Sequence, residues 1–145
     1  MKILHIAEFG LRKSGIGTVV ERLFFEQTSL GHDVRIATTS ENFAYRHLDL
    51  IYVHNPDNLS LLLIQWVPDV VMFHSIWCMP YIKIAKTLKK QKIPYLVMMH
   101  GANSAENFKK NKLKKWAANT LFFNKFLREA ATIVYLSMKE YENCV

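Results

Sequence analysis

Residues 70–101 read VVMFHSIWCMPYIKIAKTLKKQKIPYLVMMHG, and this stretch decides the fold. It begins and ends with short, continuous apolar runs, Val70–His74 and Tyr95–His100, which are typical of strands covered on both faces. Between these runs, Pro80 suits the first turn of a helix. That helix would turn four side chains inward, namely Tyr81, Ile84, Ala85 and Leu88. A strand, a helix and a second strand in this order predict a βαβ unit and therefore two parallel strands.

The same alternation extends to both ends of the chain. Four further runs are predicted as strands: Lys2–Ile6, Val34–Thr38, Leu50–Val53 and Thr132–Leu136. No fixed-period repeat or low-complexity tract interrupts the pattern. Because strands alternate with segments of helical period, we predict an α/β fold with three layers. It would be a Rossmann-like open parallel sheet with helices on both faces.

Several residues mark the ends of the predicted helices. Gly31 stands where a C′ glycine would end the helix between the first two strands. Asn58 can cap a helix that runs through Trp66. A long helix is predicted from about Asn111 to Ala130, and Ser137-Met138-Lys139-Glu140 has the pattern of a capping box that opens one more helix.

The composition is that of one compact domain. The chain has 145 residues, of which 50% are hydrophobic and 21% charged, and it contains only 5 Gly and 4 Pro. This excludes disorder, collagen and repeat arrays. Cys78 and Cys144 form neither a disulfide framework nor a paired-cysteine zinc site, so a reducing compartment is expected. The net charge of +7 favours anionic partners such as nucleic acid, phosphorylated small molecules or an acidic membrane face.

Both ends of the chain carry an expectation. The apolar run Ile3–Ile6 is too short for a signal peptide or a membrane span, so a cytoplasmic protein is expected. The helix predicted after Ser137 meets Val145 without a C-cap glycine or a following element. We therefore expect residues 1–145 to form a single domain, cut off before a second, C-terminal domain.

Polar residues follow four of the predicted strands. In an open parallel sheet, ligands bind outside the carboxyl ends of the strands, where the strand order reverses. The loop after the first strand leads into a helix N-terminus whose N–H groups would suit a phosphate or a sugar hydroxyl. The candidate binding residues at these strand ends are Ser14, Gly15, Gly17, His74, Ser75, His100, Gly101 and Ser137.

Each candidate also has a structural interpretation. Gly15 and Gly17 could simply let the loop turn and pack close to the sheet, and His74 suits a hydrogen-bonded core histidine equally well. His100 is followed by Gly101, which permits close approach of the backbone, so a functional role in a crevice is favoured there. Four other histidines lack metal-ligand spacing and are interpreted as structural or solvated: His5, His32, His47 and His54. No metal site is predicted.

A dinucleotide-binding dehydrogenase would begin in the same way, but its fingerprint is missing. The Gly-x-Gly-x-x-Gly motif should follow the first strand at once, whereas Gly15 comes well after Ile6 and Val20 stands at the third glycine position. The acidic residue expected at the end of the second strand is also missing. Neither a P-loop nor a Gly-x-Ser-x-Gly elbow occurs in the chain.

Five segments, in this order and spacing, resemble a known family. They are Met1–Ile6, Ser14–Leu23, Leu30–Val34, Pro68–His74 and Pro94–Gly101. Together they resemble the N-terminal half of retaining GT-B glycosyltransferases of family 4, over almost the whole chain. In that family the N-terminal Rossmann-like domain mainly holds the acceptor. A second such domain binds the nucleotide-sugar donor.

The resemblance implies roles for individual residues. Gly15 and Gly17 match the glycine loop that approaches the donor diphosphate and the acceptor, and Ser14 stands where a third glycine is often found. His100 matches the histidine that faces the donor sugar, so it is the expected catalytic residue. Glu8 is the nearest carboxylate at a strand end, but we do not assign it as a nucleophile. The implied reaction moves a sugar from a nucleotide-sugar to a glycan or lipid-linked acceptor with retention, and it needs no cofactor. Bacterial surface-polysaccharide assembly is the commonest setting of such enzymes.

Two alternatives remain beside this interpretation. The first is a stand-alone flavodoxin-like or Rossmann-like nucleotide-binding module. Nucleic-acid binding ranks lower, because basic residues lie along helices without an interleaved aromatic strand surface, so no nucleic-acid partner is expected.

The segment Lys109–Arg128 combines basic residues and no acid with more apolar residues than one helical face can hold. One interpretation is that Trp116, Phe123 and Leu127 pack on the sheet while the lysines are solvated. The other is a contact with an anionic membrane surface, in which Lys109–Arg128 would bring the protein to the inner face of the membrane as a peripheral protein.

Overall fold

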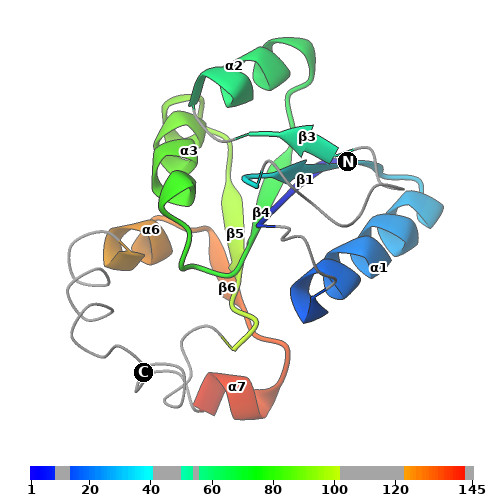
Figure 1. Cartoon of the computed structure of the whole chain (residues 1–145), viewed down its shortest axis with the longest axis vertical. Helices are drawn as coiled ribbons and strands as arrows, with labels where there is room; N and C mark the ends of the chain where they lie inside the picture. The colour runs from blue at the N-terminus through cyan, green and yellow to red at the C-terminus, as the bar shows by residue number, and fades with distance from the viewer. Residues whose placement is uncertain (9–13, 41–49, 54–55, 102–122, 143–145) are drawn as a thin grey trace.

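The computed structural model describes residues 1–8, 14–40, 50–53, 56–101 and 123–142 (Figure 1). Its strands are β1 (Lys2–Ala7), β2 (Asp33–Thr38), β3 (Leu50–Tyr52), β4 (Val70–His74), β5 (Tyr95–Met98) and β6 (Thr132–Val134). They form one sheet in the order β3-β2-β1-β4-β5-β6, and every pair is parallel. The predicted open parallel sheet is confirmed.

The strand order reverses at β1. Its residue Ile3 pairs with Val34 of β2 on one side and with Val70 of β4 on the other. The chain therefore runs outward from β1 to β3, returns to β4 beside β1, and then runs outward again to β6. The junction of β1 and β4 is the topological switch point, where the connections leave on opposite faces of the sheet.

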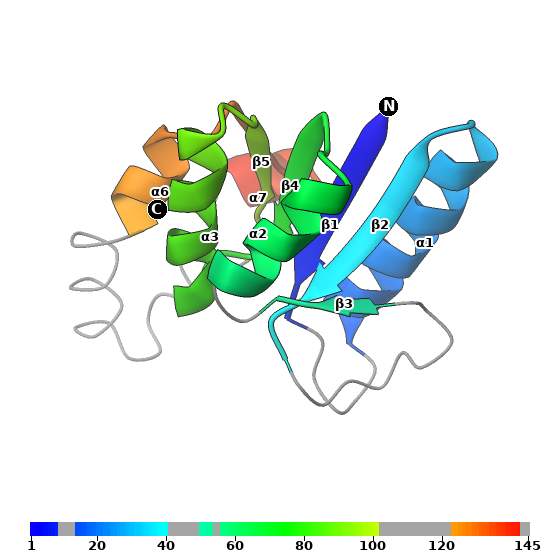
Figure 2. The ribbon, with the colours of Figure 1, turned by 90° about the horizontal axis from the view of Figure 1, so that it is seen from above.

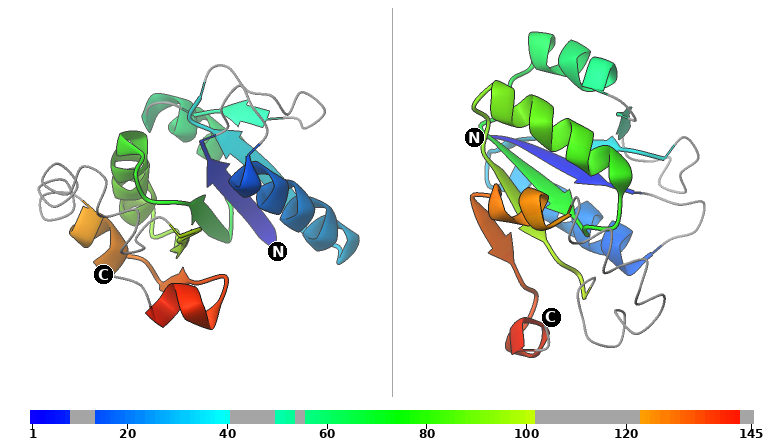
Figure 3. Two further views of the ribbon diagram at one scale, coloured as in Figure 1. Left: turned by 60° about the horizontal axis from the view of Figure 1, so that its bottom comes forward. Right: turned by 90° about the vertical axis from the view of Figure 1, so that its left-hand side faces the viewer.

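The described helices are α1 (Gly15–Ser29), α2 (Pro56–Gln65), α3 (Met79–Lys90), α6 (Asn124–Arg128) and α7 (Met138–Glu142). Figures 2 and 3 show α1 on one face of the sheet and α2, α3 and α6 on the other. The larger core lies under the second group, where Leu59, Ile84 and Phe126 pack with Phe73. The smaller core joins Val20 of α1 to Ala7 and Ile36. Helices thus cover both faces, as the sequence predicts.

Strand parity assigns each side chain to one of these faces. Leu4 and Ile6 of β1, like Val71 and Phe73 of β4, belong to the core under α2 and α3. The alternate positions therefore face the α1 side. His5 and His74 occupy such positions and are both buried.

Several element boundaries differ from the prediction by no more than a few residues. Asn58 is not an N-cap, because α2 begins two residues earlier, at Pro56, and proline is favoured in the first turn of a helix. Strand β5 ends at Met98, two residues early, since His100 has a φ of 51° that no strand residue adopts. Strand β6 likewise ends at Val134.

The long helix predicted from Asn111 to Ala130 is described only from residue 123 onward. There α6 ends at Arg128, with Glu129 as its C-cap. The lysines at positions 109–115 lie outside the described residues, as do His47, His54 and Cys144.

The predicted glycine at the end of α1 is confirmed. Gly31 has a φ of 83°, its N–H donates to the carbonyl of Thr28, and the N–H of His32 donates to the carbonyl of Gln27 at 3.1 Å. This is a Schellman motif, which satisfies the last carbonyls of the helix. It also fixes Gln27 on the last turn of α1.

Candidate functional site

A buried tyrosine marks the switch point at the carboxyl edge of the sheet. The hydroxyl of Tyr81, on α3, donates to the carbonyl of His74 at 3.1 Å and lies 3.4 Å from the carbonyl of Ile6. It thus connects the ends of β4 and β1. Burial raises the pKa of Tyr81 well above its usual value, so the phenol stays protonated and continues to donate.

The N-terminus of α1 follows β1 at this edge. Ser14 is the N-cap, and its Oγ accepts from the N–H of Gly17 at 3.1 Å. The Ser14 side chain therefore occupies one of the N–H groups in the first turn of α1. A side chain at Gly15 would meet no atom of the described residues within 4 Å, so tight packing does not require this glycine.

The ends of β4 and β5 both turn through left-handed backbone. Ser75 has a φ of 76°, His100 of 51° and Gly101 of 69°. The N–H of Ser75 donates to the carbonyl of Met98 at 2.8 Å, which ties the two strand exits together. Serine and histidine adopt such angles rarely and at an energetic cost, and residues of this kind cluster at functional sites.

A chain of three histidines leads from this turn into the protein. Nε2 of His100 lies 2.9 Å from Nδ1 of His74, and Nε2 of His74 lies 2.9 Å from Nδ1 of His5. Nε2 of His5 lies 2.8 Å from Oε1 of Gln27, on α1. Burial lowers the pKa of each imidazole, most strongly at His74, where the neighbouring histidines lower it further. All three rings are therefore held neutral near pH 7.

His74 has the position of a hydrogen-bonded core histidine, because it is 1% exposed and bonded through both ring nitrogens. His100 is half-buried, so it is the member of the chain that a ligand can reach. Sequence reasoning left His5 aside as structural or solvated. The strand register holds the missing signal: His5 pairs with Met72, two residues before His74, and His74 pairs with Met98, two residues before His100.

Helix α7 supplies a carboxylate to the same turn. Ser137 opens the helix, and its Oγ accepts from the N–H of Glu140 at 3.1 Å, which confirms half of the predicted capping box. The Glu140 carboxylate accepts instead from the N–H of Leu136, at 2.5 Å, and from the N–H of Gly101. Burial lowers the pKa of His100 and the charge of Glu140 partly opposes that shift. Sequence reasoning had not singled out Glu140 as a site residue.

The structure thus gathers most of the predicted residues at one edge. Hydrogen bonds connect the exits of β4, β5 and β6, through Ser75, Gly101 and Glu140. Ser14 and the two glycines come from α1, which bonds to the same histidine chain at its other end, through Gln27. Among the described residues, no group of three or more His, Cys, Asp or Glu side chains could hold a metal ion.

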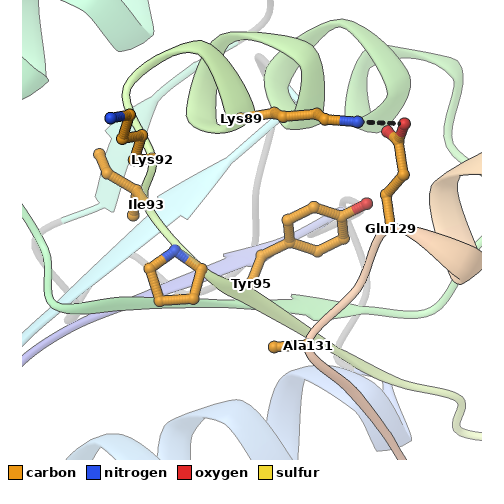
Figure 4. Close-up of a pocket in the computed structure, with 7 residues that line it drawn as sticks. Lys89, Lys92, Ile93, Tyr95, Glu129 and Ala131 are labelled. Carbon is orange, nitrogen blue, oxygen red and sulfur yellow. Dashed lines mark hydrogen bonds and ion pairs between the residues drawn. The ribbon is translucent and has the colours of Figure 1, made fainter.

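A pocket of about 290 Å³ lies at the opposite edge of the sheet (Figure 4). Its lining residues are Lys89, Lys92, Ile93, Pro94, Tyr95, Glu129 and Ala131. They precede or begin β5 and β6, so the pocket belongs to the amino ends of the strands. Nζ of Lys89 lies 2.5 Å from Oε1 of Glu129, and this hydrogen bond lowers the pKa of Glu129.

In the part of the chain that the structure describes, no helix is long and apolar enough to cross a membrane.

Neither a protein-family model nor a curated protein sequence matches this chain significantly. Solved structures do match its fold. An α-glucosyltransferase in complex with UDP and a 13-mer DNA containing an HMU base aligns with a TM-score of 0.62 and 17% identity, covering 93% of this chain and 37% of that chain. An α-glucosyltransferase in complex with UDP aligns with a TM-score of 0.62 and 16% identity, covering 93% of this chain and 35% of the other.

A third structure, an α-glucosyltransferase with UDP and a 13-mer DNA containing a central A:G mismatch, has a TM-score of 0.60, 18% identity, and coverage of 95% and 37%. This chain therefore spans well under half the length of the proteins it matches. Likeness at this identity concerns the fold alone. The chain has the Rossmann-like fold of a domain found in these α-glucosyltransferases.

Proposed function

We propose that this chain is the acceptor-side domain of a glycosyltransferase that moves a sugar from a nucleotide-sugar to a glycan or lipid-linked acceptor, with retention. The observation that carries the proposal is the carboxyl edge at the switch point. There the strained exits of β4 and β5, at Ser75 and His100, lie hydrogen-bonded together beside the end of β1. In open parallel sheets this is where ligands bind.

The edge offers groups that suit a sugar substrate. His100 presents a half-buried neutral imidazole, which can exchange hydrogen bonds with a hydroxyl. A side chain at Gly101 or Gly15 would meet none of the described atoms within 4 Å, which favours close approach of a ligand to the backbone. Ser75 and the first turn of α1 add further polar groups. We assign substrate contacts to Ser14, Gly15, Ser75, Gly101 and Ser137, and the catalytic contact to His100, with His74 acting through it. Gly17 receives no such assignment, because it is buried and its N–H donates to Ser14.

The α-glucosyltransferases that share the fold were solved with UDP, which supports a nucleotide-sugar donor. Because this chain spans 37% of the length of the first of them, we expect the main contacts of the nucleotide to come from another domain. The charge that develops on the leaving diphosphate would be stabilised mostly there. We expect the 145-residue chain to be catalytically silent alone.

Phe123 and Phe126 are buried in the core, so neither can enter a membrane. A membrane contact through Lys109–Arg128 would therefore depend on residues outside the described part and on exposed cations such as Lys125.

A transfer assay with the natural full-length protein tests the proposal. Radiolabelled UDP-, GDP- and ADP-sugars are offered with three acceptors: a soluble oligosaccharide, a lipid-linked saccharide and duplex DNA. We expect transfer to one of the two saccharides, with the anomeric configuration of the donor kept in the product. Transfer to DNA alone would contradict the proposed acceptor, and inversion would contradict the proposed stereochemistry.

The alternative function, a stand-alone flavodoxin-like or Rossmann-like nucleotide-binding module, can be tested on the 145-residue chain. The glycosyltransferase proposal expects weak or no binding of FMN, NAD or ADP by calorimetry. Micromolar binding of one of them, together with the absence of sugar transfer by the full-length protein, would favour the module instead.

A further inference from the structure

The histidine chain that ends at His100 has a fixed direction. Among its ring nitrogens, both of His5, both of His74 and Nε2 of His100 take part in its hydrogen bonds. A neutral imidazole carries one N–H and one lone pair, so it can donate through one nitrogen only. The choice made at one end of the chain therefore sets the proton position on every ring.

In this structure Gln27 sets the direction by presenting its carboxamide oxygen, Oε1, to Nε2 of His5. With its Oε1 as the acceptor, His5 donates through Nε2–H and accepts at Nδ1. His74 must then donate to His5 through Nε2–H and accept at Nδ1 from Nε2–H of His100. Nδ1 of His100 takes part in none of the hydrogen bonds of the histidine chain, so this atom is left as a hydrogen-bond acceptor.

The nature of the end group keeps the chain neutral. A carboxylate in the place of Gln27 would stabilise an imidazolium, as the aspartate of a catalytic triad does. A carboxamide carries no charge and neither takes up nor releases a proton near neutral pH. The histidine chain therefore fixes which nitrogen of each ring is protonated, but it passes no proton on to Gln27. Two other described groups face the histidine chain. From α3, the hydroxyl of Tyr81 donates to the carbonyl of His74, and from α7, the charge of Glu140 partly opposes the lowering of the His100 pKa by burial.

The position of the rings follows from the register. Each histidine lies two residues beyond the partner of the previous one, so the chain crosses β1, β4 and β5 diagonally toward the carboxyl edge. Such diagonal neighbours on one face of a sheet are within reach of aromatic side chains. Burial of His5 and His74 lowers the pKa of both rings, which favours the neutral forms that the order requires.

We propose that Gln27, His5 and His74 are positioning residues that hold His100 neutral and protonated at Nε2, so that its Nδ1 accepts a hydrogen bond from a substrate hydroxyl. The substrate rests on the proposed function. Which nitrogen of each histidine ring carries the proton depends on the histidine chain and Gln27 alone, so it can be measured without substrate.

The test is nitrogen NMR of the ¹⁵N-histidine-labelled 145-residue chain at pH 7. In the wild type, Nε2 should be protonated and Nδ1 unprotonated on His5, His74 and His100. Gln27 lies half-buried on the last turn of α1, so Gln27→Leu removes the acceptor without opening the core. In this variant the two ring nitrogens of His100 should shift toward values averaged over both tautomers, although His100 lies two rings away from the substituted residue.

A second variant and a control complete the test. Gln27→Glu keeps an acceptor, so it should preserve the Nε2–H order and raise the pKa of the three rings. His32→Gln removes a half-buried histidine that is not part of the histidine chain. It should change neither the protonated nitrogen nor the pKa of the three rings. A wild-type His100 protonated at Nδ1, or a His100 tautomer that stays the same in Gln27→Leu, would overturn the proposal.

Activity separates this proposal from the proposed function. In the natural full-length protein, Gln27→Leu should lower kcat/KM by about 10-fold, the size typical of residues that orient a catalytic group. The expected NMR pattern without any sugar transfer would contradict the glycosyltransferase and support the proton order.

Discussion

Two residues at the carboxyl edge hold the left-handed backbone that only glycine adopts freely. Ser75 and His100 have φ angles of 76° and 51°, and such a conformation costs about 1–3 kcal/mol for each residue. Hydrogen bonds hold both in place: the N–H of Ser75 donates to Met98, and the His100 ring is bonded to His74. The protein thus tolerates the conformational cost of two left-handed residues where the ends of β4 and β5 meet. Such strain is more typical of a functional site than of a loop that only connects two elements.

Stability should depend on pH through the buried histidines. The folded pKa of His74 lies well below its ordinary value of 6.5, and those of His5 and His100 are also lowered. Below pH 6.5 the unfolded chain binds protons that the folded chain refuses, so stability is full above this pH and is lost as the pH falls. The loss approaches about 1.4 kcal/mol per pH unit for each such proton.

Urea unfolding of the chain at pH 7.5, 6.5 and 5.5 measures this loss. His32→Gln is the control and should leave the pH dependence unchanged, because His32 makes none of the hydrogen bonds that connect His5, His74 and His100. A midpoint that is the same at all three pH values would show that the three histidines are accessible to protons in the folded state.

His100→Ala should abolish most of the activity without unfolding the protein. A half-buried ring at the strand exit leaves space that water can fill, so the free energy of unfolding should fall by no more than about 1 kcal/mol. In the natural full-length protein, kcat/KM should drop about 100-fold or more, as for groups that assist proton movement or bind reacting atoms. Unchanged turnover with a clearly lowered Tm would assign His100 to the core instead.

Two helices end in the same motif with different residues at its critical position. In α1 the left-handed residue is Gly31, whereas in α3 it is Lys92, with a φ of 58°. The N–H of Ile93 donates to the carbonyl of Leu88 at 3.0 Å, and the N–H of Lys92 donates to that of Lys89 at 3.1 Å. Helix α3 thus makes both bonds of the motif at the cost of a strained lysine.

Exchanging these residues should change stability in opposite directions. Lys92→Gly relieves the strain and should raise the free energy of unfolding by about 0.5–1 kcal/mol, with a Tm increase of about 2–3 °C. Gly31→Ala has room for its methyl group but not for its φ of 83°, and should cost about 1 kcal/mol. Thermal unfolding of both variants decides the point, and a lower Tm for Lys92→Gly would contradict it.

Most elements could be predicted from the sequence because their signals are local. Continuous apolar runs gave the six strands, and Gly31 gave the end of α1. The N-cap at Asn58 was wrong because a proline two residues earlier is a stronger start signal than an asparagine side chain. The predicted end of β5 is late because hydrophobicity continues through Met99 while the backbone turns at His100. The predicted end of β6 is late because Tyr135 and Leu136 continue the apolar run after Val134.

The site could be predicted only as a set of strand ends. Which side chains meet there depends on strand register, which brings His5, 69 residues before His74 in the chain, into hydrogen-bond contact with it. Glu140 was missed for a similar reason. Its position in a capping box predicted a bond within its own helix, but the carboxylate also reaches the N–H of Gly101 on a different element.

At the scale of the whole molecule, the two edges of the sheet differ in character. The carboxyl edge gathers the histidine chain, the start of α1 and the exits tied by Glu140. The amino edge carries the pocket between α3, β5 and the segment after α6, crossed by the Lys89–Glu129 ion pair. The proposed function assigns the substrate to the first edge.

A membrane contact is a separate prediction. Basic residues near an anionic leaflet contribute about 1 kcal/mol each, so the lysine-rich part of Lys109–Arg128 should bind vesicles that contain phosphatidylserine or phosphatidylglycerol. Binding should weaken with salt and be lost when Lys109, Lys110, Lys112, Lys114 and Lys115 become Gln. Vesicle sedimentation measures it, and equal binding to neutral vesicles, or none at low salt, would remove the membrane contact.

Hydrogen exchange measured by mass spectrometry on the natural full-length protein tests the central claim most directly. The claim is that the carboxyl edge at the switch point holds the substrate. With UDP and a saccharide acceptor at saturating concentration, the account predicts slower exchange in residues 14–18, 74–78 and 99–101. It predicts no change in residues 89–95 and 129–131, which surround the pocket at the opposite edge. Protection confined to the pocket segments, or no protection in this domain, would contradict the account.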